Sequence, residues 1–287
     1  PREGEFPVVG YSINSTLHSV PACQSIVKRA VVDRLSAAYG IAQFPETGRR
    51  YQVRFSIMKD EVTVGLDTSG EGLYKRGYRA HGVAAPLKET LAAAMVKLSH
   101  YNGRDPFCDP FCGSGTIAIE AALIARNRAP GLNRSFAAQH WATLDKMLWL
   151  DAADEAMDNE FHGNYEIWGG DIDPDAVELS RHNAELAEVD DIVKFEVDDA
   201  TRFHWGGLYG RIVTNPPYGE RLLEREEAGE LYKAFGKAMD KLPDTWRVYV
   251  LSSHPDFERC YGRFADKKRK LYNGMLKCDL FMYGKRL

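Results

Sequence analysis

The sequence predicts an α/β protein of the Rossmann-like kind, with a mostly parallel seven-stranded sheet. From residue 86 onward, short apolar segments alternate with helical segments of roughly ten to fifteen residues. Strands separated by helices of this length form a parallel sheet that helices cover on both faces. The strand-like residues 276–283 near the end predict a closing antiparallel hairpin. The first eighty residues have a different pattern and predict a smaller α+β module.

The α+β module is expected to contain a helix followed by two strands. Residues 25–39 have apolar side chains at helical spacing, and residues 51–57 alternate between apolar and polar side chains. Lys59 and Asp60 supply a turn before a second strand at residues 61–67. The loop at residues 69–72 then ends this pattern. We therefore expect a first domain at residues 1–80 and a second at residues 81–287.

The second domain is expected to alternate between helices and strands along its whole length. Helices are predicted at residues 87–98, 116–126, 174–187 and 231–242. Strands are predicted at residues 105–109, 165–170, 192–197, 211–214 and 247–252. Residues 127–164 interrupt the alternation, and their aromatic side chains predict a packed insertion instead of a disordered linker.

Composition is that of an ordinary globular protein, with 44% hydrophobic residues and a net charge of −4. No apolar run approaches the roughly 20 residues of a membrane span. The odd number of cysteines, five in all, favours reduced thiols in the cytoplasm. Cys108 and Cys112 lack a second Cys or His pair at zinc spacing, so no metal is expected. The start, Pro1-Arg2-Glu3-Gly4-Glu5, suggests a cut edge within a longer protein. The oligomeric state is left open.

Basic residues gather locally, although the whole chain is slightly acidic. Each cluster taken alone is typical of a solvated protein face. Together they are compatible with a polar substrate without establishing one. The clusters are Lys28-Arg29, Arg49-Arg50, Lys75-Arg76 with Arg79, and Lys267-Lys268-Arg269-Lys270.

A glycine-rich loop follows the first predicted strand of the second domain. Its sequence is Asp109-Pro110-Phe111-Cys112-Gly113-Ser114-Gly115-Thr116. In open α/β sheets, ligands bind beyond the carboxyl ends of the strands, and glycines let the backbone approach them closely. Ala118 stands where a dinucleotide fingerprint has its third glycine, which disfavours a nucleotide oxidoreductase. Asp109 instead suits a cationic group, such as the amino group of a methionine-like ligand.

Acidic residues follow the next two predicted strands. Asp171 is placed to accept the hydroxyl groups of a ribose, with Ile172 flanking an adenine ring. Asp173 precedes Pro174 and is interpreted as a helix cap. In Asp198-Asp199-Ala200, one carboxylate is a candidate for the adenine amino group, although both are also compatible with ordinary loop acids.

The segment Asn215-Pro216-Pro217-Tyr218 follows the fourth predicted strand. Consecutive prolines lack N–H donors and fix φ, which gives a rigid stretch with free carbonyl groups. The Asn215 side chain and the Pro216 carbonyl can then accept both hydrogens of an exocyclic amine, while Tyr218 offers a stacking face. Alone, the segment is equally compatible with a structural turn. Its position downstream of the glycine loop favours catalysis.

These features together resemble the class I S-adenosylmethionine methyltransferases that modify amino groups. That family has an acidic, glycine-rich first loop, an acid after the second strand and Asn/Asp-Pro-Pro-Phe/Tyr after the fourth. The resemblance covers roughly residues 86–287. It implies that Asp109, Pro110, Phe111, Cys112, Gly113, Ser114, Gly115, Thr116, Asp171, Ile172, Asp199, Ala200 and Asn215 contact the cofactor. It also implies that Asn215, Pro216, Pro217 and Tyr218 are catalytic.

A narrower resemblance is to THUMP-containing RNA guanine-N2 methyltransferases, and most of all to the bacterial enzymes that act on 23S ribosomal RNA. The segments that carry it are Ser15-Thr16-Leu17-His18-Ser19, Asp67-Thr68-Ser69-Gly70, Lys75-Arg76-Gly77-Tyr78-Arg79, Ala85-Pro86-Leu87-Lys88-Glu89-Thr90, Ala125-Arg126-Asn127, Ala129-Pro130-Gly131 and Lys268-Arg269-Lys270-Leu271-Tyr272-Asn273-Gly274.

This resemblance implies that residues 1–80 are the later part of a THUMP-like RNA-binding module. Further cofactor contacts are then expected from Pro86, Leu87 and Thr90, at the methionine end of the pocket. Contacts to RNA are expected from Lys75, Arg76, Arg79, Lys268, Arg269 and Lys270.

The resulting prediction is a cytoplasmic enzyme that methylates the exocyclic N2 of a guanine in RNA, with 23S ribosomal RNA favoured. Its mechanism would be direct in-line transfer, which needs positioning more than a strong base. A DNA adenine-N6 or protein glutamine methyltransferase shares the Asn-Pro-Pro-Tyr segment and stays an alternative. A non-catalytic RNA-binding module is the alternative from another class.

Overall fold

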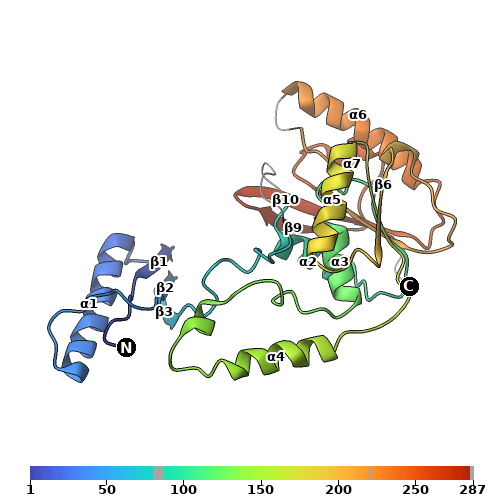
Figure 1. The fold of residues 1–287 in the computed structure, drawn as a ribbon. Helices are drawn as coiled ribbons and strands as arrows, with labels where there is room; N and C mark the ends of the chain where they lie inside the picture. Colours follow the sequence, from blue (N-terminus) through green and yellow to red (C-terminus); the bar gives the residue numbers. More distant parts are fainter. Residues whose placement is uncertain (80–86, 220–221, 285–287) are drawn as a thin grey trace. The chain divides into compact units, whose positions relative to one another are not determined.

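The computed structural model describes residues 1–79, 87–219 and 222–284. The chain forms two compact units: residues 1–73 with 135–153, and residues 74–134 with 154–287 (Figure 1). This division differs from the expected boundary after residue 80, because part of the predicted insertion belongs to the first unit. Trp141 stacks on Tyr51, with ring centroids 5.1 Å apart, and its indole N–H donates to the Arg50 carbonyl.

The first unit contains a three-stranded sheet in the order β1-β2-β3. Strand β1 (Val8–Ile13) pairs in parallel with β2 (Val53–Met58), and helix α1 (Val20–Tyr39) connects them. Strand β3 (Glu61–Leu66) returns antiparallel through a turn in which Lys59 and Asp60 have positive φ. The predicted helix and hairpin are present, whereas β1 was not expected. Strand β1 lies at the sheet edge and no residue in it is buried, so its sequence pattern is weak.

The second unit contains a seven-stranded sheet in the order β6-β5-β4-β7-β8-β10-β9. Strands β4 (Phe107–Asp109), β5 (Ile167–Asp171), β6 (Val193–Val197), β7 (Arg211–Thr214) and β8 (Arg247–Ser252) are parallel. Strand β10 (Leu276–Tyr283) runs antiparallel to β8 and to β9 (Lys267–Asn273). The prediction of a mostly parallel sheet closed by an antiparallel hairpin is confirmed.

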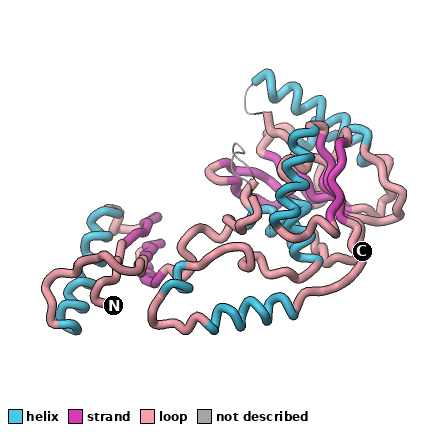
Figure 2. Tube along the Cα trace, viewed as in Figure 1, coloured by secondary structure: helices cyan, strands magenta, loops and turns pink. Residues whose placement is uncertain are grey.

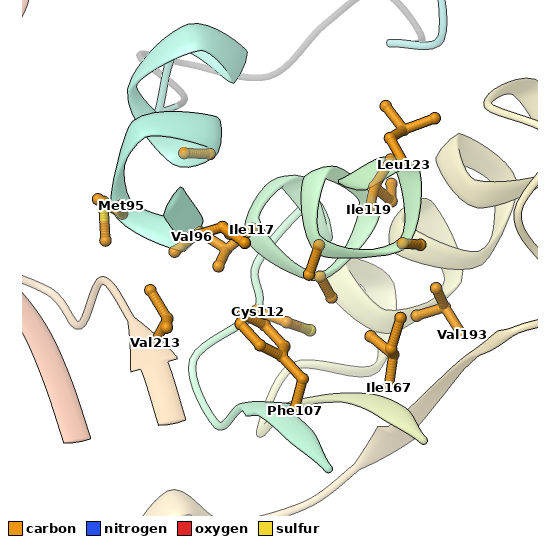
Figure 3. Close-up of a cluster of buried hydrophobic side chains, with 14 of the residues drawn as sticks. Met95, Val96, Phe107, Cys112, Ile117, Ile119, Leu123, Ile167, Val193 and Val213 are labelled. Carbon is orange, nitrogen blue, oxygen red and sulfur yellow. The ribbon is translucent and has the colours of Figure 1, made fainter. Parts of the chain in front are cut away.

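Helices cover both faces of this sheet (Figures 1 and 2). Alternate strand residues belong to two hydrophobic clusters: Phe107 and Val213 face one, and Cys108 and Ile212 face the other. The first cluster, part of which is drawn in Figure 3, contains side chains from helices α2 (Glu89–Leu98), α3 (Thr116–Ala125) and α5 (Pro174–Leu186). The second contains side chains from α6 (Leu222–Met239) and α7 (Phe257–Tyr261).

Other elements differ from the sequence expectations. Helix α6 begins at Leu222, well before the expected residue 231, because residues 224–230 are mostly charged and carry little apolar periodicity. Helix α4 (Met147–Asp158) was not expected and has no buried residue. Short 3-10 turns occur at Ala137–His140 and Ala200–Arg202. None of the described helices is both long and apolar enough to cross a membrane.

Helix α6 approaches the end of α7 so closely that only glycine fits at residue 236. A Cβ atom at Gly236 would lie 2.1 Å from the Tyr261 carbonyl oxygen. We expect Gly236→Ala to lower the free energy of unfolding by about 1–3 kcal/mol, because backbone must move. Gly229→Ala on the same helix is the control, since its Cβ would meet only the Cys260 sulfur at 3.3 Å. Denaturant unfolding of both variants measures the difference, and equal stabilities would contradict the prediction.

Candidate active site

The candidate site lies at the carboxyl ends of β4 and β7, where the strand order reverses. From β4 the chain adds β5 and then β6 on one side, and β7 and then β8 on the other. Ligands of open α/β sheets bind at such a switch point. Here the Thr214 hydroxyl, at the end of β7, donates a 2.6 Å hydrogen bond to Asp109 Oδ1, at the end of β4. The predicted glycine loop and the Asn215 segment therefore start side by side.

The glycine loop has the backbone conformation that its sequence predicts. Gly113 and Gly115 have φ of +52° and +79°, values that residues other than glycine rarely adopt. A Cβ on Gly115 would lie 2.9 Å from the Phe195 ring and from Ser180 Cβ, whereas a Cβ on Gly113 would meet nothing within 4 Å. Gly115 is thus needed for packing beneath the loop. Gly113 leaves open space where a ligand can approach the backbone.

The remaining residues of this loop are mostly turned inward. Pro110 is buried, and the half-buried Phe111 packs edge-on against Phe235 in the second hydrophobic cluster. Cys112 is 6% exposed and lies beside Phe107 in the first cluster (Figure 3). The Ser114 carbonyl accepts from the Asn183 side chain, and Thr116 begins helix α3. The backbone of Cys112 is also engaged: its N–H donates to the Gly170 carbonyl at 2.9 Å, and its carbonyl accepts from the Gly115 N–H at 2.8 Å. Cys112 therefore stabilises the loop.

Asp109 is fully buried at the base of the loop. Its Oδ1 accepts from Thr214 and from the Phe111 N–H, while its Oδ2 has no hydrogen-bond partner among the described residues. Burial, opposed by these hydrogen bonds, raises the pKa of Asp109 to about 7. An unpaired buried carboxylate oxygen is costly. A cationic amino group supplied by a ligand would satisfy it, so the residue fits the methionine end of S-adenosylmethionine.

Asp171, at the end of β5, is tied to the glycine loop. Its Oδ2 accepts from the Gly113 N–H at 2.9 Å, and its Oδ1 accepts from the Asp173 N–H at 3.1 Å. Sequence reasoning placed Asp171 at the ribose but missed this second role of holding the loop. The following Ile172 is 72% exposed, as a residue that flanks an adenine would be before ligand binding. Asp173 caps α5 by accepting from the Asp175 N–H, which confirms its interpretation as a cap.

Asp199 begins the short 3-10 turn after β6. Its Oδ1 accepts from the N–H and the hydroxyl of Thr201, and these hydrogen bonds lower its pKa. Asp199 therefore stays ionised, and its Oδ2 remains oriented towards the Arg202 side chain at 3.6 Å. The adjoining Ala200 is 6% exposed. A contact between Asp199 and an adenine amino group stays a prediction.

The Asn215-Pro216-Pro217-Tyr218 segment continues from β7 directly into the site. Asn215 is half-buried, and its Oδ1 accepts a hydrogen bond from the Tyr218 hydroxyl. The Pro217 carbonyl accepts from Tyr232 at 2.5 Å, which anchors the segment to α6. Tyr218 thus orients the Asn215 side chain, whose amide oxygen has two lone pairs. The use of the Tyr218 ring as a stacking face stays a prediction.

The predicted RNA contacts at Arg76 and Arg79 require a correction. The Arg76 guanidinium pairs with Glu120 at 3.3 Å and is only 13% exposed. Arg79 pairs with Glu89 at 3.4 Å, is 18% exposed, and donates to the Thr116 hydroxyl at 2.8 Å. Both cations compensate buried carboxylates and are not free to bind phosphate. Arg79 instead supports the start of the helix that follows the glycine loop.

The other residues predicted to contact RNA or the cofactor differ in their exposure to solvent. Lys75 is exposed, as are Lys268, Arg269 and Lys270 on β9, although Lys268 pairs with Glu258 at 2.7 Å. Leu87 is buried and Thr90 is exposed on α2, whereas Pro86 lies outside the described residues. Among the described residues, no group of three or more His, Cys, Asp or Glu side chains is arranged to hold a metal ion.

Sequence reasoning missed two sets of residues around the site. The Tyr78 hydroxyl donates to Glu120 of α3 at 3.1 Å, and both side chains are buried, with the partly buried Arg76 pairing with the same carboxylate. Glu120, the one charged residue of the otherwise apolar α3, was the available signal, since a buried Glu requires a partner. Asn273 and Cys278 of the β9–β10 hairpin contact Tyr218. No local pattern in the sequence indicates these contacts.

The chain matches the RMKL-like methyltransferase domain family over residues 76–281. It is 47% identical over 293 residues to the Bacillus subtilis (strain 168) protein named "Putative RNA methyltransferase YpsC", covering 100% of this chain and 75% of that protein. A Listeria monocytogenes structure, described as a predicted N6-adenine-specific DNA methylase, is 47% identical with a TM-score of 0.91 and covers 99% and 74%. SMU.472, "a putative methyltransferase complexed with SAH", is 40% identical with a TM-score of 0.88 and covers 100% and 77%.

The fold and the site define a Rossmann-like methyltransferase whose methyl donor is S-adenosylmethionine. The site has the groups expected of this class at the carboxyl edge of the sheet. They are the glycine loop after β4, Asp171 at the end of β5 and the Asn-Pro-Pro-Tyr segment after β7. The chain belongs to the RMKL-like methyltransferase domain family. The sequence alternative of a nucleotide oxidoreductase is thereby set aside.

The raised pKa of Asp109 predicts that cofactor binding depends on pH. The cationic amino group of the ligand favours the ionised carboxylate, so below about pH 7 a proton must leave Asp109 on binding. The Kd for S-adenosylhomocysteine is expected to rise by up to about tenfold for each pH unit below 7 and to level off above it. Calorimetry across this range measures the slope. Asp109→Asn should bind weakly without the slope, and an unchanged slope in that variant would contradict the assignment.

Proposed function

We propose that this chain transfers a methyl group from S-adenosylmethionine to the exocyclic N2 of a guanine in RNA, with 23S ribosomal RNA as the substrate. The observation that carries the proposal is the position of Asn215. It follows Thr214, which bonds to Asp109 of the glycine loop at 2.6 Å. A nitrogen held at Asn215 is therefore next to the loop that takes the methionine end of the cofactor.

The chain's own groups perform the positioning. The bound cofactor supplies a methyl group activated on a sulfonium. Asn215 Oδ1 and the Pro216 carbonyl accept the two hydrogens of the target amine, which aims its lone pair along the line of transfer. The Tyr232 hydroxyl fixes the segment through the Pro217 carbonyl. No strong base is required at the amine, because its proton can leave after the methyl group has been transferred.

The choice of RNA has separate support. The relative YpsC is named as an RNA methyltransferase. Strand β9 presents Lys267, Lys268, Arg269 and Lys270 on exposed positions at the sheet edge, and such cations bind phosphates. The resemblance to THUMP-containing guanine-N2 enzymes supports the base, the ribosomal substrate and an RNA-binding role for a module at residues 1–80.

The main rival is methylation of the adenine N6 in DNA, the activity named in the description of the Listeria structure. Asn215 accepts hydrogens from either exocyclic amine, so the segment itself is neutral between the two bases. A glutamine side chain in a protein presents the same kind of nitrogen. A binding module without catalysis is the less favoured reading, because Asp109, the glycine loop and Asn215 are all in place.

Labelled cofactor incubated separately with ribosomal RNA, genomic DNA and total protein tests the proposal. Nucleoside analysis is expected to find label in N2-methylguanosine from RNA. Label found only in N6-methyladenine or only in protein would overturn the substrate. Binding of S-adenosylhomocysteine without transfer to any of the three would favour the binding module. Mapping the labelled nucleotide then identifies the RNA segment that is recognised.

A further inference from the structure

The β9–β10 hairpin projects beyond the carboxyl edge of the sheet, where Asn215 lies. Asp279 of β10 pairs with Ser252, the last residue of β8, and Val250 of β8 pairs with Thr214 of β7. Strand β10 begins at Leu276, so the hairpin continues past the end of β8 by three residues, or about 10 Å at the usual strand rise. The hairpin turn therefore stands beyond the strands that position the catalytic segment.

Tyr218 links this hairpin to Asn215. Its hydroxyl donates to Asn215 Oδ1, and the Cys278 sulfur lies 3.8 Å from the same hydroxyl. Burial, and then Cys278, raise the pKa of Tyr218, while a hydrogen bond from the Asn273 side chain opposes the rise. Asn273 is the last residue of β9. The base of the hairpin turn is therefore joined to the amide that holds the target amine through a single side chain.

The turn itself presents an apolar side chain to solvent. Asn273 pairs with Leu276, which leaves Gly274 and Met275 as a two-residue loop. Gly274 has φ of +63°, as the first loop position of a type II′ turn requires. Met275 is 99% exposed, and Tyr272, near the end of β9, is 57% exposed. A tight hairpin thus holds a flexible, unbranched hydrophobic side chain at its tip.

The strand that leads to this tip is basic. Strand β9 is the edge strand of the sheet, and Lys267, Lys268, Arg269 and Lys270 are exposed along it. Lys268 is held against the protein by Glu258, at 2.7 Å, and by the Phe281 ring. A basic strand that ends in an apolar tip combines attraction to phosphates with a side chain able to enter between bases.

We propose that the tip of the β9–β10 hairpin enters structured RNA next to the target nucleotide, with Met275 filling the place that the target base leaves. The exocyclic amine of a paired base points into the duplex, so the base must leave the stack to reach Asn215. Met275 follows Asn273 by two residues, and the Asn273 side chain bonds to Tyr218, which donates to Asn215. The thioether chain of Met275 adapts to the gap between bases. This inference rests on the proposed function and specifies that its RNA substrate is base-paired at the target.

Two RNAs built around the mapped nucleotide test this role: a stem that pairs the target base, and the same strand alone. Met275→Ala is expected to lower kcat/KM on the stem by at least about tenfold and to change it by less than about twofold on the single strand. Phe264→Ala is the matched control, because Phe264 is 82% exposed and precedes the opposite end of β9. This variant should keep the wild-type kcat/KM on both RNAs. With 2-aminopurine at the target, Met275→Ala should also reduce the fluorescence increase that reports unstacking.

Failure of the role of the hairpin tip and failure of the proposed function would give different results. If Met275→Ala leaves the ratio of kcat/KM between stem and single strand at its wild-type value, the role of the hairpin tip is overturned while RNA methylation stands. A proportional loss on both RNAs has the same consequence, because it would indicate a general structural effect. If the wild-type protein methylates neither RNA but methylates DNA or protein, the proposed function itself is wrong and the inference falls with it.

Discussion

Asn215→Ala is expected to lower kcat for methyl transfer by about a hundredfold to a thousandfold, the loss typical of removing one preorganised hydrogen-bonding group. The variant lacks the side-chain oxygen that accepts from Tyr218 in the structure and from the target amine in the proposed mechanism. Its Kd for S-adenosylhomocysteine should change by less than about threefold, since the glycine loop and Asp171 are retained. Single-turnover transfer to ribosomal RNA and calorimetry measure the two quantities separately.

Asn215→Asp is the matched variant, because it keeps an acceptor oxygen and the size of the side chain. We expect it to retain measurable transfer, above that of Asn215→Ala. A thermal unfolding measurement on both variants excludes a loss of folded protein as the cause. Full activity of Asn215→Ala would remove Asn215 from the mechanism and, with it, the observation on which the proposed function depends.

Asp171→Ala is expected to have the largest effect on cofactor affinity. The Asp171 carboxylate accepts from the Gly113 N–H at 2.9 Å and from the Asp173 N–H at 3.1 Å. Its removal releases the glycine loop and also deletes the predicted acceptor for the ribose hydroxyls. Hydrogen bonds to a charged group contribute about 1.5–3 kcal/mol each, so the Kd for S-adenosylhomocysteine should rise by about a hundredfold or more.

Asp173→Ala separates this effect from a change in stability. Asp173 caps α5 through its side chain, whereas its bond to Asp171 uses only the backbone N–H, which alanine keeps. The variant should lose about 1 kcal/mol of stability, as is usual for a lost N-cap, and keep its cofactor affinity. Equal losses of affinity in the two variants would contradict the assignment of Asp171 to the cofactor.

The buried strands of the second unit were the most predictable part of the fold. Strands β7, β8 and β10 have the bounds that the sequence predicts. In β7 and β8 a nearly continuous apolar run follows the first residue, as is typical of strands covered on both faces. Two elements without a buried residue were not predicted. Helix α4 lies in the segment expected to be an insertion, and β1 lies at a sheet edge.

The roles of charged and polar side chains were less predictable than the strands. Arg76 and Arg79 are adjacent to Lys75 in a basic segment that sequence reasoning assigned to RNA. In the structure, Arg76 pairs with Glu120, which is 44 residues away along the chain. Because an ion pair depends on which carboxylates the fold brings near, a local cluster of charge cannot distinguish a phosphate contact from a buried partner.

The residue types and their order along the chain were enough to predict the kind of protein and the chemistry available to it. The glycine loop, Asp171 and the Asn215 segment each follow a predicted strand, which is the pattern of a methyl-transfer site. How these groups meet depends on the folded chain. Thr214 and Asp109 are 105 residues apart, and Gly113 and Asp171 are 58 apart, yet both pairs are hydrogen-bonded. The physical reason is that β4 has β5 and β7 as parallel neighbours, so the carboxyl ends of these three strands lie side by side in the sheet. The position of Tyr218 between Asn215 and the closing hairpin is likewise set by the fold and not by the local sequence.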